Sequence, residues 1–333
     1  MEVVELNEIR REDWAELVDG SSVATWFQTK EAYVFFGSLS FWERFGFAVK
    51  TDGKLKGVVL GVVQREGGIV RRFLSRRAIV FGGPLLSNDI TEGELAELLH
   101  ETTKRLKKKA IYIEMRNFND YSRWKKTFES AGFRYDPHLN VHVDTTSWSV
   151  VERKLDRNRR RNIKKARENG VVIDSNPTLE DVRTFYSMLE RLYRTKVKTP
   201  LYPFEFFERL RETRDARFFM AKTKDGVLIG GLACVVLEKH AVYAWMACGE
   251  DRQYSALSPS VMVNYAGIQY ASEQGFPCFD FMGAGKPDDG GYGVRDFKLK
   301  FGGDLVEHGR YVFVCDPLLY GIGKLGVKIL RKK

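Results

Sequence analysis

The sequence predicts an α/β protein made of two related domains. The chain has 333 residues, which is longer than a single hydrophobic core usually supports. Apolar segments with helix and strand periodicity alternate along it. The order of these segments in the first half recurs in the second, and SAGF at 130–133 is echoed by EQGF at 273–276. We therefore expect a mixed sheet flanked by helices in each half.

The first half is expected to begin with a helix over Trp26–Phe36. A hairpin follows over residues 45–66, because two apolar strands flank the turn pair Asp52-Gly53. A strand over 77–86 contains Gly82-Gly83-Pro84, which stops regular structure. The half is completed by a helix from about Thr91 to Lys109, a strand over 110–117, a helix over 123–133 and a strand near 138–145.

The second half repeats this order. Helices are predicted over Asp181–Leu192 and Phe204–Leu210, followed by three strands over 216–248 with a first turn at Lys224-Asp225-Gly226. A helix over 260–275 and a strand over 278–284 come next. Residues 297–314 are expected to close this domain, which gives predicted domains of 1–146 and 147–315 and a tail of 316–333.

Composition limits the classes of function. The formal net charge of +10 favours polyanionic partners such as tRNA, nucleotide diphosphates or an anionic membrane face, although solvated surface cations would give the same value. No run approaches the ~20 apolar residues of a membrane-spanning helix, and the N-terminus does not resemble a signal peptide. We expect a cytoplasmic protein. Its four cysteines lie far apart without a CxxC pair, which disfavours a zinc site or a disulfide framework.

The run from Glu152 to Lys165 is the most distinctive segment. It is dense in Arg and Lys, has helix-forming composition and ends at Asn169-Gly170, a pair suited to a helix cap. One interpretation is an exposed linker helix. The sharper one is a helix that binds phosphate, because guanidinium groups match phosphate oxygens in geometry and charge.

A second candidate is the segment GYGVRDFKLKFGG at 291–303. On an extended segment, Phe297 and Phe301 would point to one side and Lys298 and Lys300 to the other. The flanking glycines permit tight turns and close approach to a ligand. A plain solvent-facing strand explains the pattern equally well.

Several kinds of catalysis lack their sequence signals. GxSxG is absent, no histidine has HxxE or HxxH spacing, and neither a Walker A motif nor GxGxxG occurs. We expect no metal, no ATP site and no NAD site.

The tail 316–333 alternates apolar residues with lysines and ends in RKK, so it could dock on the first domain or rest on an anionic membrane. Docking is the favoured alternative.

Four segments together resemble the Fem (FemABX) peptidoglycan aminoacyltransferases. RRNIKKARENGVVI at 160–173 is similar to the basic helix and strand that open their second domain, and residues 293–314 resemble their C-terminal Phe-Lys motif. The strand–Pro–helix–strand order over 243–284 and the segment WFQTKEAYVFFG at 26–37 also fit. The likeness covers nearly the whole chain.

The resemblance implies two tandem acetyltransferase-like (GNAT) domains. It also implies transfer of an amino acid from aminoacyl-tRNA, the co-substrate, to the side-chain amine of a muramyl-peptide precursor, without a cofactor. Peripheral contact with the inner membrane surface is compatible with such an acceptor, and oligomeric state stays open. The long coiled-coil insertion of some members is absent, which groups this chain with the compact members.

The resemblance also assigns roles to individual residues. It places Lys298 as the cation that stabilises the tetrahedral oxyanion and Glu114 as the group that orients or deprotonates the acceptor amine. Phe36 stands near the place of an expected precursor-binding lysine, with Lys30 the nearest cation, so the substrate could differ. The residues assigned to substrate are Phe297, Thr195, Lys198, Tyr243 and Trp245, and those assigned to tRNA or phosphate are Arg157, Arg159, Arg160, Arg161, Lys164 and Lys165.

Two other functions compete with aminoacyl transfer. An acyl-CoA-dependent N-acyltransferase acting on a sugar or polysaccharide precursor would share the fold. The segment RQYSALSPS at 252–260 lacks the glycines of the usual pyrophosphate loop, which disfavours this reading. A non-catalytic tRNA- or precursor-binding protein would need only the basic helix.

Overall fold

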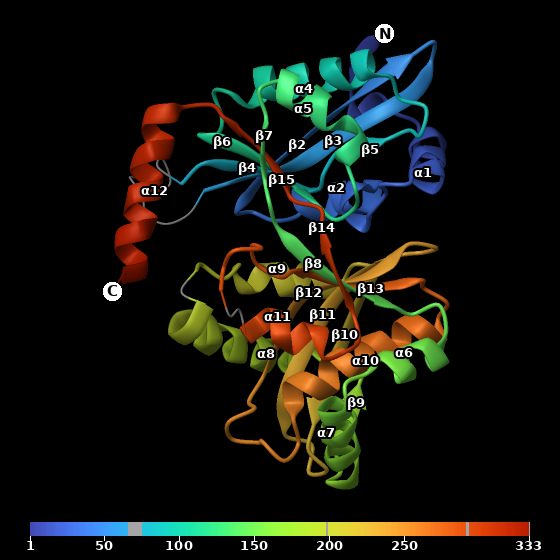
Figure 1. The fold of residues 1–333 in the computed structure, drawn as a ribbon, viewed down its shortest axis with the longest axis vertical. Helices are drawn as coiled ribbons and strands as arrows, with labels where there is room; N and C mark the ends of the chain where they lie inside the picture. The colour runs from blue at the N-terminus through green and yellow to red at the C-terminus, as the bar shows by residue number, and fades with distance from the viewer. Residues whose placement is uncertain (66–74, 198, 291–292, 333) are drawn as a thin grey trace. The chain divides into compact units, whose positions relative to one another are not determined.

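The computed structural model describes residues 1–65, 75–197, 199–290 and 293–332, with side chains described as far as residue 324 in the last helix. The chain forms two compact units (Figure 1). The first contains residues 1–138 and 308–333, and the second contains residues 139–307. Each has one mixed sheet flanked by helices.

The first unit is built on an eight-stranded sheet in the order β1-β2-β3-β4-β6-β15-β7, with β5 paired to β3. Among the described strands of this sheet, β4 and β6 pair in parallel and the other neighbours are antiparallel. The elements are β1 (Glu2–Glu5), α1 (Arg11–Gly20), α2 (Lys30–Gly37), β2 (Trp42–Thr51), β3 (Lys54–Gln64), β4 (Arg77–Gly82), β5 (Leu85–Leu86), α4 (Glu92–Leu106), β6 (Tyr112–Asn117), α5 (Lys125–Ser130), β7 (Arg134–Asp136), β15 (Arg310–Val314) and α12 (Pro317–Lys332), with 3₁₀ turns at Leu6–Glu8, Trp26–Gln28 and Ser122–Trp124.

Local sequence explains the main features of this unit. Asp52 and Gly53 both have positive φ, as the two-residue turn of a twisted hairpin requires. Thr91 and Glu94 form a capping box at the start of α4. Leu95, Leu98 and Leu99 then bury one face of that helix against the sheet.

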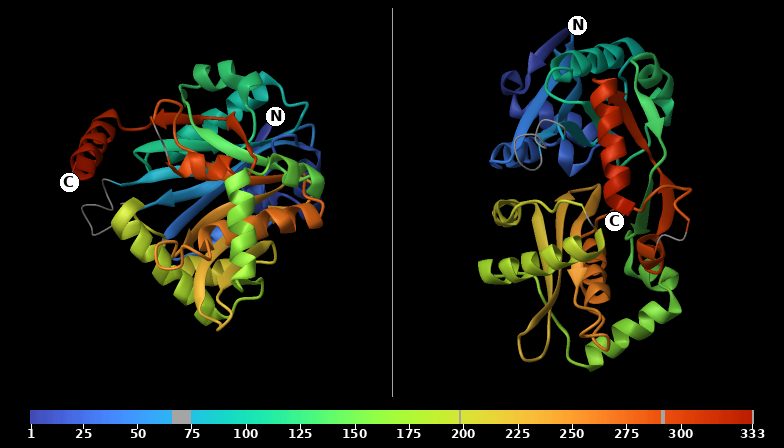
Figure 2. Two further views of the ribbon diagram at one scale, coloured as in Figure 1. Left: turned by 60° about the horizontal axis from the view of Figure 1, so that its bottom comes forward. Right: turned by 90° about the vertical axis from the view of Figure 1, so that its left-hand side faces the viewer.

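The second unit has a seven-stranded sheet in the order β14-β8-β13-β12-β11-β10-β9. Helices α8 and α9 cover one face, and α7 and α10 cover the other (Figure 2). The elements are β8 (Leu139–Asp144), α6 (Trp148–Lys154), α7 (Arg157–Glu168), β9 (Val172–Asp174), α8 (Leu179–Leu192), the π-helical turn η4 (Tyr193–Val197), α9 (Phe204–Arg211), β10 (Ala216–Lys222), β11 (Leu228–Leu237), β12 (Ala241–Gly249), α10 (Pro259–Glu273), β13 (Cys278–Gly283), α11 (Gly293–Leu299) and β14 (Asp304–Glu307).

Strands β12 and β13 are parallel neighbours over a short stretch only. Pairing runs from Ala241 opposite Cys278 to Tyr243 opposite Asp280, and no further pair follows within these described strands. β12 nevertheless continues to Gly249. Beyond Tyr243 the two strands therefore no longer pair with each other.

Most predicted elements are present, with three differences. The expected helix over Trp26–Phe36 is a 3₁₀ turn followed by α2, because the Thr29 side chain accepts the Ala32 amide and starts a new helix. The basic run is divided into α6 and α7 at Leu155, because Asp156 caps α7 through the Asn158 and Arg159 amides. The segment expected to be extended around Lys298 is the helix α11.

The two units do not follow the predicted boundaries of 1–146, 147–315 and 316–333. Strand β8 belongs to the second sheet, although it lies inside the predicted first domain. Strand β15 belongs to the first sheet, where it pairs with both β6 and β7. The Tyr311 ring of β15 stacks on Phe128 of α5 at 3.9 Å between centroids, which buries it in the first core. Strands β14 and β15 are thus consecutive along the chain but belong to different sheets.

The tail forms α12, which begins against the first unit. The Asp316 amide donates to the Ile111 carbonyl at 3.0 Å, and the Tyr320 ring lies 5.2 Å from that of Tyr112. Leu318 and Ile322 remain 74% and 49% exposed. None of the helices in the described residues is both long and apolar enough to cross a bilayer.

Candidate functional site

The Lys298 ammonium is held by the backbone at the end of β13. Its Nζ atom donates to the Phe281 carbonyl and to the Gly283 carbonyl, at 2.7 Å in each case. An ammonium has three N–H donors. Within the described residues, two of these donors have carbonyl partners and the third has none.

Partial burial changes the acidity of this group. Removal from water lowers the pKa of Lys298 to about 8, and the charge of Asp280 opposes that change. Lys298 is therefore mostly a cation at neutral pH, but a weakly hydrated one. Such a cation is suited to stabilising negative charge that develops on a reacting oxygen.

Arg159 positions the helix that carries Lys298. Its guanidinium lies between the rings of Phe297 and Phe301, 4.5 Å from each centroid, and donates to the Phe297 carbonyl at 3.0 Å. Only 5% of the residue is exposed. The sequence resemblance assigned Arg159 to tRNA or phosphate, whereas in the structure its side chain joins α7 to α11.

A small pocket of about 280 Å³ lies where these two helices meet. Cations and amides dominate its lining, with one carboxylate among them. The lining residues are Asn158, Arg159, Asn162, Gly293, Asp296, Phe297 and Lys300.

The outward side of α7 carries four exposed cations, Arg157, Arg161, Lys164 and Lys165. Their spacing of i, i+4, i+7 and i+8 places them on one helix face, which we call the α7 cationic face. Arg160 is also exposed, but its guanidinium donates to the Leu155 and Arg153 carbonyls at the end of α6. Of the six predicted tRNA or phosphate ligands, four therefore face solvent together.

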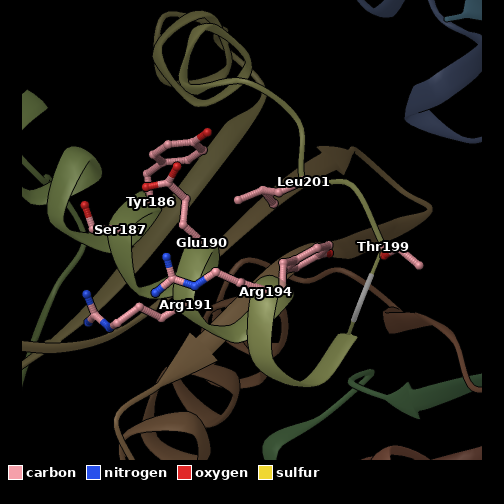
Figure 3. A pocket seen from close by; sticks show the side chains of 8 residues that line it. Tyr186, Ser187, Glu190, Arg191, Arg194, Thr199 and Leu201 are labelled. Carbon is pink, nitrogen blue, oxygen red and sulfur yellow. The ribbon is translucent and has the colours of Figure 1, made fainter. Parts of the chain in front are cut away.

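A pocket of about 770 Å³ in the second unit lies beside the end of α8 and the π-helical turn η4 (Figure 3). Arg191 and Arg194 line it, and Arg191 also pairs with Glu250. π-Helical turns often occur at functional sites. The full lining is Tyr186, Ser187, Glu190, Arg191, Tyr193, Arg194, Thr199 and Leu201.

This pocket lies next to Thr195, one of the predicted substrate-binding residues, without including it. The Thr195 hydroxyl donates to the Arg191 carbonyl at 2.7 Å, so it serves the helix end. Lys198 lies outside the described residues. The sequence did not single out Arg191 and Arg194, because the predicted helix ended at Leu192 and gave no reason to group them.

Tyr243 and Trp245, both predicted to contact substrate, lie on β12 in different surroundings. Tyr243 is buried where β12 and β13 part. The Trp245 ring packs edge-on against Phe206 of α9, with centroids 4.8 Å apart. Tyr243 thus belongs mainly to the packing of the sheet, and Trp245 is only partly buried.

Glu114 lies on β6 of the first unit and is held by two arginines. Its carboxylate accepts from Arg310 at 2.8 Å and from Arg116 at 2.5 Å. Burial acts to raise the pKa of Glu114, but the two guanidinium charges outweigh it and lower the pKa to about 2. Such a carboxylate is a weak base, which argues against its predicted role in deprotonating an amine.

The first turn of α10 is capped by a carboxylate. Asp251 accepts from the Ser260 amide at 3.1 Å and from the Ser260 hydroxyl. Helix N-termini bind anions because their amide groups lack intrahelical partners. Here a carboxylate of the protein takes that place.

Comparison with known proteins connects these features to a fold. Residues 153–298 match the family model described as an acetyltransferase (GNAT) domain. The crystal structure of FemX superposes with a TM-score of 0.74 at 14% identity, covering 97% of this chain and 99% of that chain. The protein has the tandem GNAT fold of FemX.

Other solved structures share this fold. L-PGS from Bacillus licheniformis has a TM-score of 0.59 at 14% identity, covering 94% of this chain and 96% of that one. A tandem GNAT protein from the clavulanic acid biosynthesis pathway has a TM-score of 0.58 at 11% identity, covering 95% and 99%. A comparison with curated protein sequences gives no match. The prediction of two GNAT-like domains is confirmed, and so is the resemblance to Fem proteins at the level of the fold.

Proposed function

We propose that the protein is an aminoacyltransferase that moves an amino acid from aminoacyl-tRNA to the side-chain amine of a muramyl-peptide precursor. The observation that carries the proposal is the Lys298 ammonium, which is gripped by two carbonyls and keeps one N–H for a ligand. Attack by an amine on an ester carbonyl creates a tetrahedral oxyanion. A fixed cation next to that oxygen stabilises the transition state more than the ground state.

The reaction needs no further chemical group. The acceptor nitrogen forms an amide bond to the carbonyl carbon as the bond from that carbon to the ribose oxygen breaks. The proton lost by the nitrogen ends on the leaving ribose oxygen. Holding the two substrates in line supplies much of the acceleration.

The α10 N-terminus supports tRNA over acyl-CoA as the donor. A CoA pyrophosphate bound at this helix end would meet the Asp251 carboxylate, which already accepts the Ser260 amide. Like charges at that distance repel. By contrast, the α7 cationic face offers an exposed surface to a nucleic-acid backbone.

The Arg-lined pocket beside η4 supports an acceptor that carries a diphosphate. Arg191 and Arg194 supply guanidinium groups there, which bind phosphate oxygens through paired N–H donors. Tyr186 adds an aromatic ring to the same lining. A nucleotide-linked or lipid-linked muramyl peptide has both a diphosphate and a free amine.

Peripheral contact with the cytoplasmic membrane surface is part of the proposal. α12 exposes Leu318 and Ile322 and continues into a lysine-rich end, a combination typical of helices that lie on anionic lipid. Co-sedimentation with anionic vesicles, but not with neutral ones, is expected. Loss of α12 without loss of vesicle binding would contradict this contact.

The proposal is tested by supplying radiolabelled donors separately to the purified protein with nucleotide-linked and lipid-linked muramyl pentapeptides. Label is expected to reach the peptide amine from a pool of charged tRNAs. Label arriving from acetyl-CoA alone would overturn the donor assignment. It would support the second candidate, an acyl-CoA-dependent transferase, which the match to an acetyltransferase domain favours.

A further inference from the structure

The last residues of β13 have an irregular backbone. The register of β13 against β8 shifts between Asp280 and Gly283, which marks a bulge. Met282, within it, has a φ of 56°, a left-handed conformation that is uncommon for a residue with a side chain. The Asp280 carboxylate accepts from the Met282 amide at 2.6 Å. This hydrogen bond ties the irregular turn to the buried strand before it.

The bulge brings two backbone carbonyls close enough together for both to accept hydrogen bonds from the Lys298 ammonium. In a regular strand, the carbonyls of residues two apart lie roughly 7 Å from each other. One nitrogen cannot then be 2.7 Å from both. Here the Phe281 and Gly283 carbonyls, on either side of Met282, both reach the Lys298 ammonium at that distance. The turn at Met282 therefore creates the cation site.

Asp280 also acts on the Lys298 ammonium through its negative charge. It is 1% exposed, and its attraction opposes the loss of the Lys298 proton. On its other side, Oδ2 lies 3.4 Å from Nε2 of His142 on β8. Burial acts to lower the pKa of His142, but attraction to Asp280 outweighs it, so the net pKa is raised.

Other charged or titratable groups surround this pair. Asp304 of β14 lies opposite His142 in the strand register, and Cys278 is on β13 itself. Arg159 approaches from α7 through the Phe297 and Phe301 rings. Arg295 of α11 donates to the Ala284 and Lys286 carbonyls just after the bulge.

We propose that Asp280 is a positioning residue for transfer: its carboxylate fixes the bulge whose carbonyls hold Lys298, and its charge keeps Lys298 protonated. This inference rests on the proposed function in that Lys298 must act on the transferred acyl group. The two roles are separable by substitution. Asn can still accept the Met282 amide but carries no charge, whereas Ala does neither.

The test measures the pKa of Lys298 directly, by the pH dependence of its labelling with an amine-reactive reagent read by peptide mass spectrometry. Asp280→Asn is expected to lower that pKa by about one pH unit, as loss of a nearby opposite charge does. In transfer assays the fall in kcat at alkaline pH should shift to lower pH by the same amount, and KM for tRNA should not change. Asp280→Ala is expected to lower kcat at least tenfold further at pH 7.

Two variants serve as controls. His142→Asn disturbs the same buried pair but leaves the carboxylate, so the pKa of Lys298 should not fall. Asp304→Asn removes an exposed carboxylate on the neighbouring strand and should leave both measurements unchanged. A packing defect alone would affect His142→Asn and Asp280→Asn alike.

Unchanged Lys298 labelling in folded Asp280→Asn would overturn the role of the charge. Wild-type kcat in Asp280→Ala would overturn the positioning role. If the unmodified protein transfers no aminoacyl group, the proposed function fails. The labelling experiment still decides whether Asp280 controls Lys298.

Discussion

Lys298 shows how a single side chain obtains its chemistry from the backbone around it. Two carbonyls fix the direction of its ammonium group, and reduced access to water lowers its pKa. The sequence could identify Phe297-Lys298 through its resemblance to a motif, but not this environment. The two accepting carbonyls flank a turn at Met282, a residue type that gives no signal for positive φ.

Lys298→Met is expected to lower kcat about 100-fold or more, because an oxyanion donor is lost while the apolar stem is kept. Single-turnover transfer measures this loss. Lys298→Arg keeps a cation and should retain more activity than Lys298→Met. Equal activity of wild-type and folded Lys298→Met would remove this residue from the mechanism.

The pKa of about 8 for Lys298 gives a pH dependence with a definite sign. If the protonated form acts, kcat falls as pH rises through about 8, and Lys298→Arg lacks that limb because guanidinium stays charged. The effect on stability is opposite. The unfolded chain binds this proton more tightly, so stability from this group increases between about pH 8 and pH 10. Steady-state profiles and urea denaturation across this range measure the two effects.

Among the helices, α7 has different surroundings on its two sides. Arg159 faces inward between two aromatic rings, while the α7 cationic face points to solvent. The sequence predicted the charge density of this segment but not its division, because Asp156 acts as a cap only once the chain has turned at Leu155. It also predicted a strand where α11 forms, since aromatic and basic residues alternate there with a period of two.

Replacing Arg157, Arg161, Lys164 and Lys165 by Gln is expected to weaken tRNA binding in a salt-dependent way. The slope of log affinity against log salt concentration should fall by about 3, as for the loss of several phosphate contacts. Lys107, Lys108, Lys125 and Lys126, exposed on the first unit, provide a matched control for net charge. If both quadruple variants lose the same affinity, the α7 cationic face has no special role.

The pocket beside η4 leads to a separate prediction for the acceptor. Arg194→Gln should raise KM for a nucleotide-linked muramyl peptide about tenfold with little change in kcat, because a charged hydrogen bond to phosphate contributes mainly to binding. A muramyl peptide without the diphosphate is the internal control, and its KM should not change. A uniform rise for both acceptors would indicate a general distortion of the pocket.

Over the whole molecule, the repeated order of elements was sufficient to predict two α/β domains. It was not sufficient to place their boundaries, because pairing between strands distant in sequence leaves no local pattern. β15 reads like a continuation of β14, yet it pairs with β6 and β7 of the first sheet. The burial of Tyr311 against Phe128 explains that choice.

This arrangement predicts unequal behaviour of the two halves as fragments. Residues 139–307 contain every strand of the second sheet and should fold alone, with a cooperative thermal transition in circular dichroism. Residues 1–146 lack β15, which leaves β7 without its partner, and should aggregate or remain protease-sensitive. Joining residue 138 directly to residue 308 restores β15 and should rescue folding, since the Gly309 amide already donates to the His138 carbonyl. A stable 1–146 fragment would contradict this prediction.

The position of β15 also sets an order of events during synthesis on the ribosome. The N-terminal sheet emerges first but must wait for residues 139–307 to be translated before its missing strand arrives. At about 5–20 residues per second, that interval is on the order of ten to thirty seconds. During it, β6 presents an unpaired edge, the kind of surface that chaperones bind and that aggregation exploits. The domain begun first is therefore the one completed last.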